Sequence, residues 1–104
     1  MEIAELNPES FQTALKQPAV LIDFYAPWCG PCRNMAISLA KFADEYPEIT
    51  IGKVNIEKEE NRELTAAYDV STIPSLFFFR NGKLEKHLVG FYSVDALAKQ
   101  LQLD

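Results

Sequence analysis

Both cysteines of the chain lie in the stretch Trp28-Cys29-Gly30-Pro31-Cys32, with two residues between them. A near-continuous apolar segment, residues 19–25, precedes this stretch, and a segment with helical spacing follows it. A Cys-x-x-Cys pair between a strand and a helix is typical of thiol–disulfide exchange in a small intracellular protein. Cys29 would then begin the helix, where unpaired N–H groups and the helix dipole favour the thiolate that attacks a disulfide.

The spacing of the pair predicts a two-step exchange. Cys29 attacks a substrate disulfide and forms a mixed disulfide with one of its sulfurs. Cys32 then loses its proton and attacks Cys29, which releases the reduced substrate and leaves the pair oxidised. Pro31 stiffens the turn between them and has no N–H donor, which should change the relative stability of the dithiol and the disulfide.

Three other interpretations of the cysteines compete with redox chemistry. A zinc site needs about four ligands, and the other strong candidate is His87, a lone residue far along the chain. A purely structural disulfide would close a very short loop and stabilise the fold little. The cysteines could also be inert and buried. The flanking Trp28, Gly30 and Pro31 favour the redox interpretation over a bare Cys-x-x-Cys.

One carboxylate, Asp23, interrupts the apolar segment that precedes the cysteines. In a strand that is covered on both faces, desolvation should raise its pKa. Such a group near a dithiol could accept the proton of Cys32, directly or through a water. The alternative is a solvated aspartate at an exposed strand end.

Size and composition limit the function. With 104 residues, the chain should form one domain over residues 1–104, and its 48% hydrophobic content is ordinary for a globular protein. The net charge of −5 and the scattered basic residues argue against binding to nucleic acid or to an anionic membrane. No apolar run approaches the roughly 20 residues of a membrane span. The acidic start without a signal-type apolar region predicts a cytoplasmic protein, although an exported domain after processing would look similar.

Hydrophobic periodicity, caps and breakers predict the order β-α-β-α-β-α-β-β-α. The expected strands are residues 2–6, 20–25, 49–56, 76–80 and 83–89, and the expected helices are 8–16, 32–46, 57–68 and one beginning after Ser93. Asn81-Gly82 predicts a hairpin between the last two strands. Early strand–helix–strand units should be parallel with right-handed crossovers, so we expect an α/β fold with helices on both faces of a mixed sheet.

Helical spacing also predicts which side chains face the core. The stripe Met35–Leu39–Phe42 should be buried, as should Leu64, Ala67 and Tyr68 in the helix expected over 57–68. His87 should be a solvated residue of the last strand.

The stretch 23–32 resembles the active site of the thioredoxin family. The likeness covers essentially the whole chain and includes residues 53–56, 73–75, 81–82 and 89–90. It implies the thioredoxin fold, a central mixed five-stranded sheet flanked by four helices. It also implies a general protein-disulfide reductase that needs no metal or bound cofactor, acts as a monomer and is recharged by a thioredoxin reductase. Implied clients are of the peroxiredoxin, ribonucleotide reductase or methionine sulfoxide reductase types.

The resemblance implies further site residues. Asp23 matches the buried aspartate of the family, and Lys53 matches the lysine that approaches it, unless Lys53 is simply a solvated strand residue. Pro74 matches a cis-proline that faces the cysteines, and the backbone of Ile73 would receive an extended substrate.

The same substrate groove should be flanked by Trp28, Gly30, Pro31 and Gly90. Trp28 would be a partly exposed lid rather than a core residue.

Two departures from the family pattern stand out. Ile37 occupies a position where the family usually has a proline that kinks the helix, so the helix shape and the reduction potential are in doubt. Tyr25 replaces a more common tryptophan. Rival functions remain a specialised reductase or oxidant that serves one exported client, and a structural or chaperone-like subunit that uses the fold for docking.

Overall fold

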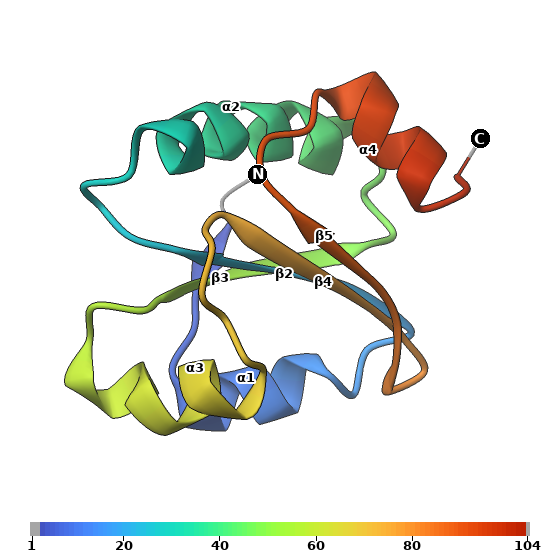
Figure 1. Cartoon of the computed structure of the whole chain (residues 1–104). Coiled ribbons are helices and arrows are strands. Elements are labelled where there is room, and N and C mark those ends of the chain that lie inside the picture. Colours follow the sequence, from blue (N-terminus) through green and yellow to red (C-terminus); the bar gives the residue numbers. More distant parts are fainter. Residues whose placement is uncertain (1–2, 104) are drawn as a thin grey trace.

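A computed structural model describes residues 3–103 and shows one central sheet with helices on both faces (Figure 1). Within these residues the sheet has five strands in the order β1-β3-β2-β4-β5. The strands are β1 (Ala4–Glu5), β2 (Ala19–Tyr25), β3 (Thr50–Asn55), β4 (Ser75–Arg80) and β5 (Lys83–Val89). The helices are α1 (Pro8–Ala14), α2 (Gly30–Glu45), α3 (Arg62–Ala67) and α4 (Val94–Gln100), and a short 3-10 helix, η1 (Glu59–Asn61), precedes α3.

The sheet is mixed, as the element order predicts. β3 lies between β1 and β2 and is parallel to both, whereas β4 is antiparallel to β2 and to β5. Helices α2 and α4 cover one face of the sheet, and α1 and α3 cover the other (Figure 1). The expected α/β fold with a five-stranded mixed sheet and four helices is therefore confirmed.

Local sequence signals explain where most elements begin. The Asn7 side chain accepts a hydrogen bond from the Ser10 N–H at 2.8 Å, with Pro8 in the first turn of α1. Ser93 caps α4 in the same way through the Ala96 N–H at 3.2 Å. Gly82 has a φ of 81° between β4 and β5, a conformation that glycine adopts without steric cost.

Most boundaries differ from the sequence predictions by one or two residues, and three differences have a clear structural reason or limit. β1 is limited to Ala4–Glu5, and the predicted position 2 lies outside the described residues. α2 begins at Gly30 rather than Cys32, because Cys29 is its N-cap and its Sγ accepts the Cys32 N–H at 3.2 Å.

The third difference concerns the helix predicted over residues 57–68, which is wrong in extent. The chain forms η1 and then a shorter α3, and Ala67 is exposed rather than buried. The Asn61 side chain donates to the Asn55 carbonyl at 2.9 Å, so the polypeptide turns tightly against the end of β3 before α3 can begin.

The other two residues that were expected to face the core from this segment, Leu64 and Tyr68, do so. Leu64 is buried, and Tyr68 is half-buried in an aromatic cluster with Phe11, Phe24, Phe77 and Phe79.

The buried stripe of α2 is confirmed, and it gives a direct test of the packing. Met35, Leu39 and Phe42 have no exposed surface, whereas Ile37 on the outer face of the same helix is 59% exposed. Leu39→Ala is expected to lower the free energy of unfolding by about 2–5 kcal/mol, because it leaves a cavity under the helix. Ile37→Ala is the matched control and should change it by less than about 0.5 kcal/mol. Chemical denaturation measures both, and equal losses would contradict this assignment of faces.

Candidate active site

The two cysteines lie where β2 passes into α2. Their Sγ atoms form a disulfide, with Cα atoms 5.2 Å apart. Both residues are buried, at 5% exposure for Cys29 and 3% for Cys32. Cys29 caps the helix N-terminus, so a thiolate formed there would face the positive end of the helix dipole. The predicted reactive position of Cys29 thus has the geometry that thiolate chemistry requires.

A loop from a distant part of the sequence, residues 73–74, lies against Cys29. The Ile73–Pro74 peptide bond is cis, in agreement with the expectation from the family pattern. Cys29 Sγ lies 3.9 Å from the carbonyl oxygen of Ile73. The Gly90 N–H donates to the Pro74 carbonyl at 2.8 Å, which ties the end of β5 to the same loop. The fold therefore brings Cys29, Ile73, Pro74 and Gly90 together.

Trp28 lies on the surface beside the pair. Its side chain is 66% exposed, which excludes the core interpretation. The indole N–H donates to a carboxylate oxygen of Glu57 at 2.9 Å. Glu57 was not among the expected site residues, since it begins the helix that the sequence predicts over residues 57–68. The hydrogen bond holds an otherwise exposed ring in a defined orientation.

Asp23 occupies the middle of β2, between Lys53 on β3 and Leu76 on β4. It is 3% exposed, and its Oδ1 has no hydrogen-bond partner among the described residues. Burial raises its pKa from 3.8 to about 7, with Lys53 acting in the opposite direction. Asp23 and Cys32 both line a cavity of about 200 Å³. A group that titrates near neutral pH thus shares an internal space with the second cysteine.

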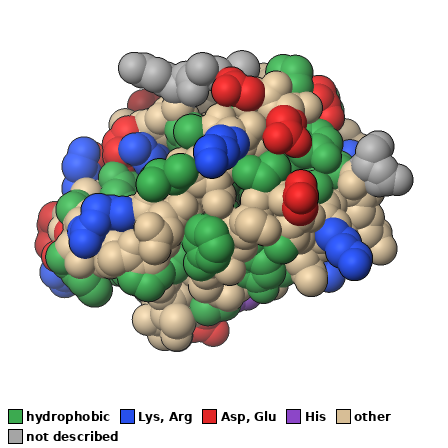
Figure 2. Space-filling model, turned by 90° about the horizontal axis from the view of Figure 1, so that it is seen from above, with side chains coloured by type: hydrophobic (Ala, Val, Ile, Leu, Met, Phe, Trp, Pro, Cys, Tyr) green, Lys and Arg blue, Asp and Glu red, His purple; other side chains and the backbone are tan. Residues whose placement is uncertain are grey.

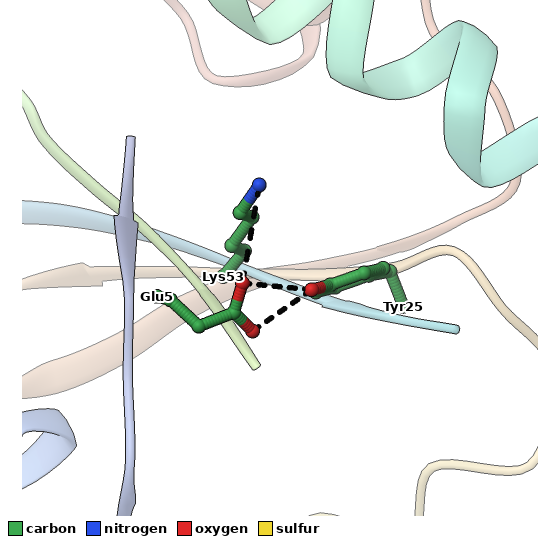
Figure 3. A network of polar contacts seen from close by, with 3 residues as sticks. All are labelled: Glu5, Tyr25 and Lys53. Atoms are coloured by element: carbon green, nitrogen blue, oxygen red, sulfur yellow. Dashed lines mark hydrogen bonds and ion pairs between the residues drawn. The ribbon is translucent and has the colours of Figure 1, made fainter. Parts of the chain in front are cut away.

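Lys53 belongs to a small polar network at the edge of this region (Figure 3). Its Nζ lies 3.9 Å from a carboxylate oxygen of Glu5 and 5.5 Å from the centre of the Tyr25 ring. The Tyr25 hydroxyl donates to the Glu5 carboxylate, 2.8 Å from each oxygen. Burial, and then the contacts with Glu5, raise the pKa of Tyr25. No sequence pattern marks Glu5, because only the register of β1 against β3 reveals its partner.

His87 takes no part in this region. It is exposed on β5, as predicted, but its Nε2 lies 2.7 Å from Ser75 Oγ and its ring stacks on Phe77 at 4.1 Å. Residues 3–103 contain no group of three or more His, Cys, Asp or Glu side chains arranged to hold a metal ion. In the same part of the chain, no helix has the length and apolar character needed to cross a membrane.

The fold and the paired cysteines define a class of protein. A disulfide lies at the start of a helix, beside a carboxyl group with a pKa of about 7. This arrangement is that of a dithiol–disulfide oxidoreductase, which carries two electrons in a reversible sulfur–sulfur bond. A protein-family model described as Thioredoxin matches residues 2–103. The chain belongs to the thioredoxin family and, with its active-site cysteine pair, is a protein-disulfide oxidoreductase.

Individual relatives agree with this assignment. The chain is 41% identical to a thioredoxin of Chlamydia pneumoniae over 85 residues, which cover 82% of this chain and 81% of the relative. It is 39% identical to a thioredoxin of Alicyclobacillus acidocaldarius over 98 residues, covering 92% and 91%. The oxidised crystal structure of mitochondrial thioredoxin 3 from Saccharomyces cerevisiae is similar with a TM-score of 0.84 and 30% identity, covering 96% and 93%.

Proposed function

We propose that the chain is a general protein-disulfide reductase that is reduced in turn by a thioredoxin reductase. The single observation that carries this proposal is the Cys29–Cys32 pair at the start of α2, which shares a cavity with Asp23 on the Cys32 side. We further propose that it acts as a monomer, as one domain over residues 1–104, in the cytoplasm.

The proposed first step forms a mixed disulfide. The Cys29 thiolate attacks one sulfur of a client disulfide, the client sulfur–sulfur bond breaks, and the departing client thiolate takes a proton. The helix N-terminus supports the thiolate, since the Cys32 N–H already points at Cys29 Sγ from 3.2 Å.

The proposed second step releases the client. The Cys32 thiol gives its proton to the Asp23 carboxylate, and the Cys32 thiolate attacks Cys29 Sγ. The mixed disulfide breaks, and the second client sulfur leaves as a thiolate that takes a proton from water. Two electrons have then passed from the Cys29–Cys32 dithiol to the client. A pKa of about 7 suits Asp23 for this role, because it can gain and lose a proton at neutral pH. Lys53, opposite Asp23, tunes that pKa.

Client docking is assigned to the surface around the pair. An extended client segment would lie along Ile73 and Pro74 and use the Ile73 backbone as an added strand does. Gly90, Gly30 and Pro31 would flank this groove without bulky side chains, and the exposed Trp28 would cover the client on one side. A Cβ atom placed at Gly30 or Gly90 would have no neighbouring atom within 4 Å, so the space above both glycines is open.

The surface charge supports protein clients rather than nucleic acid. On the face covered by α2 and α4, acidic and basic side chains are interspersed and no basic stripe is visible (Figure 2). The net charge is −5. Proteins of the peroxiredoxin, ribonucleotide reductase and methionine sulfoxide reductase types are the proposed clients.

Insulin disulfide reduction tests the proposed function. With a chemical dithiol as donor, the protein is expected to accelerate insulin reduction, and NADPH with a thioredoxin reductase should replace the dithiol. Cys29→Ser should lower either rate by at least about 1,000-fold, since the nucleophile is lost. Activity with the dithiol alone would overturn the proposed electron donor. Activity that survives in the Cys29→Ser, Cys32→Ser double variant would overturn the redox role itself.

A further inference from the structure

Glu5 takes no direct part in the exchange reaction, yet it lies beside Lys53 and Tyr25 at the edge of the site. We propose that Glu5 is a positioning residue for the redox reaction. Its carboxylate holds the Lys53 ammonium at the outer edge of the sheet, so that the Asp23 carboxyl group is left without an ion pair. This inference rests on the proposed role of Asp23 in proton transfer.

The strand register carries the first step of the inference. Glu5 on β1 is the register partner of Lys53 on β3, and Lys53 is in turn the partner of Asp23 on β2. The three side chains therefore form one row across three adjacent strands, on the face covered by α2, with Lys53 in the middle. Tyr25, two residues after Asp23, points to the same face of the sheet. Lys53 thus has a carboxylate on each side and must favour one of them.

The contacts show which carboxylate Lys53 favours. Its Nζ is 3.9 Å from Glu5, whereas Oδ1 of Asp23 has no hydrogen-bond partner among the described residues. The Tyr25 hydroxyl donates to both Glu5 oxygens and so fixes the carboxylate that receives the lysine (Figure 3). Glu5 is therefore anchored at one end by Tyr25 and pairs with Lys53 at the other.

Differences in burial explain why Lys53 pairs with Glu5 rather than with Asp23. The side chains of Lys53 and Glu5 are 36% and 37% exposed, so both ions keep part of their hydration. Asp23 is 3% exposed and would have to lose almost all its hydration to ionise. Pairing at the exposed end therefore leaves Asp23 as the neutral acid over a wider pH range.

A groove connects the two ends of the row. Asp23, Lys53 and Glu5 all line a hollow of about 510 Å³ between β1 and α2, whose α2 wall is formed by Ala36, Leu39 and Ala40. Within the part of the chain that the structure describes, the charged or titratable groups that share a hollow or a direct contact with Asp23 or Lys53 are Cys32 and Arg33 from α2, Tyr25 from β2 and Glu5 from β1. On the remaining side β4 presents Leu76, which carries no charge. Arg33 is directed elsewhere, since its guanidinium donates to the Pro27 carbonyl at 3.0 Å.

The effect of removing the Glu5 charge has an unambiguous sign. Among residues 3–103, Asp23 would be the carboxylate left beside Lys53, and a nearby cation favours the ionised form of a carboxyl group. The loss of a negative charge near Asp23 acts in the same direction. Both changes lower the pH at which Asp23 loses its proton.

Glu5→Gln tests the inference in the full-length protein. Two readouts are needed: the pH midpoint of the resolving step, measured by single-turnover kinetics on a peptide disulfide, and the titration of the Asp23 carboxyl carbon, measured by NMR in the dithiol form. Glu5→Gln is expected to lower both midpoints by about half to one pH unit. Lys53→Met should raise both. In the Lys53→Met background, Glu5→Gln should shift them by less than half as much, because the lysine that it positions is gone.

Glu85→Gln is the matched control. Glu85 is also a strand glutamate that pairs with a basic side chain, Arg80, at 3.4 Å, but it lies on β5 at the opposite edge of the sheet. Glu85→Gln changes the net charge by the same amount as Glu5→Gln and should leave both pH midpoints unchanged. Unchanged midpoints in Glu5→Gln, or an equal shift with and without Lys53, would overturn the role of Glu5.

A further variant separates this inference from the proposed function. Asp23→Asn should abolish the pH transition of the resolving step. If the transition survives, the proposed proton-transfer role of Asp23 is wrong, and the NMR titration still decides whether Glu5 acts on Asp23 through Lys53. If the transition disappears and Glu5→Gln leaves the NMR midpoint of Asp23 unmoved, the positioning role alone is wrong.

Discussion

Cys32→Ser is expected to convert the protein from a reductase that turns over into one that stops at the mixed disulfide. Cys29 keeps its place at the N-terminus of α2 and still attacks a client. The resolving thiol, whose Cα lies 5.2 Å away, is gone. An external thiol must then attack the mixed disulfide in a bimolecular step, without the proximity of Cys32. Turnover with insulin should therefore fall by at least about 1,000-fold. Non-reducing electrophoresis and mass spectrometry should detect stable covalent adducts between Cys29 and client proteins.

The paired control for this trap is the Cys29→Ser, Cys32→Ser double variant. It keeps the fold and the docking surface but has no nucleophile, so it should form no adduct that a reducing agent dissolves. Adducts of equal yield in the double variant would mean that the captured proteins are not bound through Cys29. A Cys32→Ser variant with ordinary turnover would show that Cys32 does not resolve the mixed disulfide.

Asp23→Ala is expected to slow the resolving step and at the same time to stabilise the protein. Loss of the base that takes the Cys32 proton should reduce the resolving rate at pH 7 on the order of 100-fold. The first attack by Cys29 should change little, because its thiolate depends on the helix N-terminus. Stopped-flow kinetics separate the two steps, and equal slowing of both would contradict Asp23 as the base for Cys32.

The stability effect follows from the pKa of Asp23, which is 3.8 ordinarily and about 7 in the folded chain. Between these values the folded state holds a proton that the unfolded state has lost, so wild-type stability falls as the pH rises from about 4 to 7. Asp23→Ala removes this loss of stability at higher pH, because the variant has no carboxyl group to ionise at this position. At pH 8 the variant should be more stable by about 4 kcal/mol, and the gain should vanish near pH 3.

Denaturation with urea at several pH values measures the stability gain, and Asp23→Asn is the isosteric control. The asparagine variant also lacks the titration, so its stability profile should be equally flat between pH 4 and 8. A gain that does not depend on pH would show that packing rather than ionisation is responsible.

Most elements were predictable because their signals are local. The Asn7 and Ser93 caps and the Asn81-Gly82 turn each act within a few residues, and the boundaries they predict agree with the structure to within about two residues. The helix expected from residue 57 was predicted by the same local logic. It was wrong in extent because Asn61 is drawn back to the end of β3.

The core of the candidate site was predictable for a different reason. Cys29 and Cys32 are close in sequence, so their spacing, together with the flanking Trp28, Gly30 and Pro31, indicates their chemistry. Pro74, Gly90 and Lys53 were found through family resemblance, since no local pattern says that they meet the cysteines. Glu5 was marked neither by local spacing nor by family resemblance. Its role depends on the pairing of a two-residue strand with β3, and such a register is fixed by the completed sheet rather than by the residues next to it.

The hydrogen bond between Trp28 and Glu57 also has an optical consequence. Trp28 is the single tryptophan of the chain, so light absorbed at the red edge of the aromatic band excites one indole, which is 66% exposed and adjacent to Cys29. Its ring N–H donates to Glu57 at 2.9 Å. Changes in that fluorescence during oxidation or client docking therefore originate at the active site itself, and the unlabelled protein carries its own reporter of each turnover.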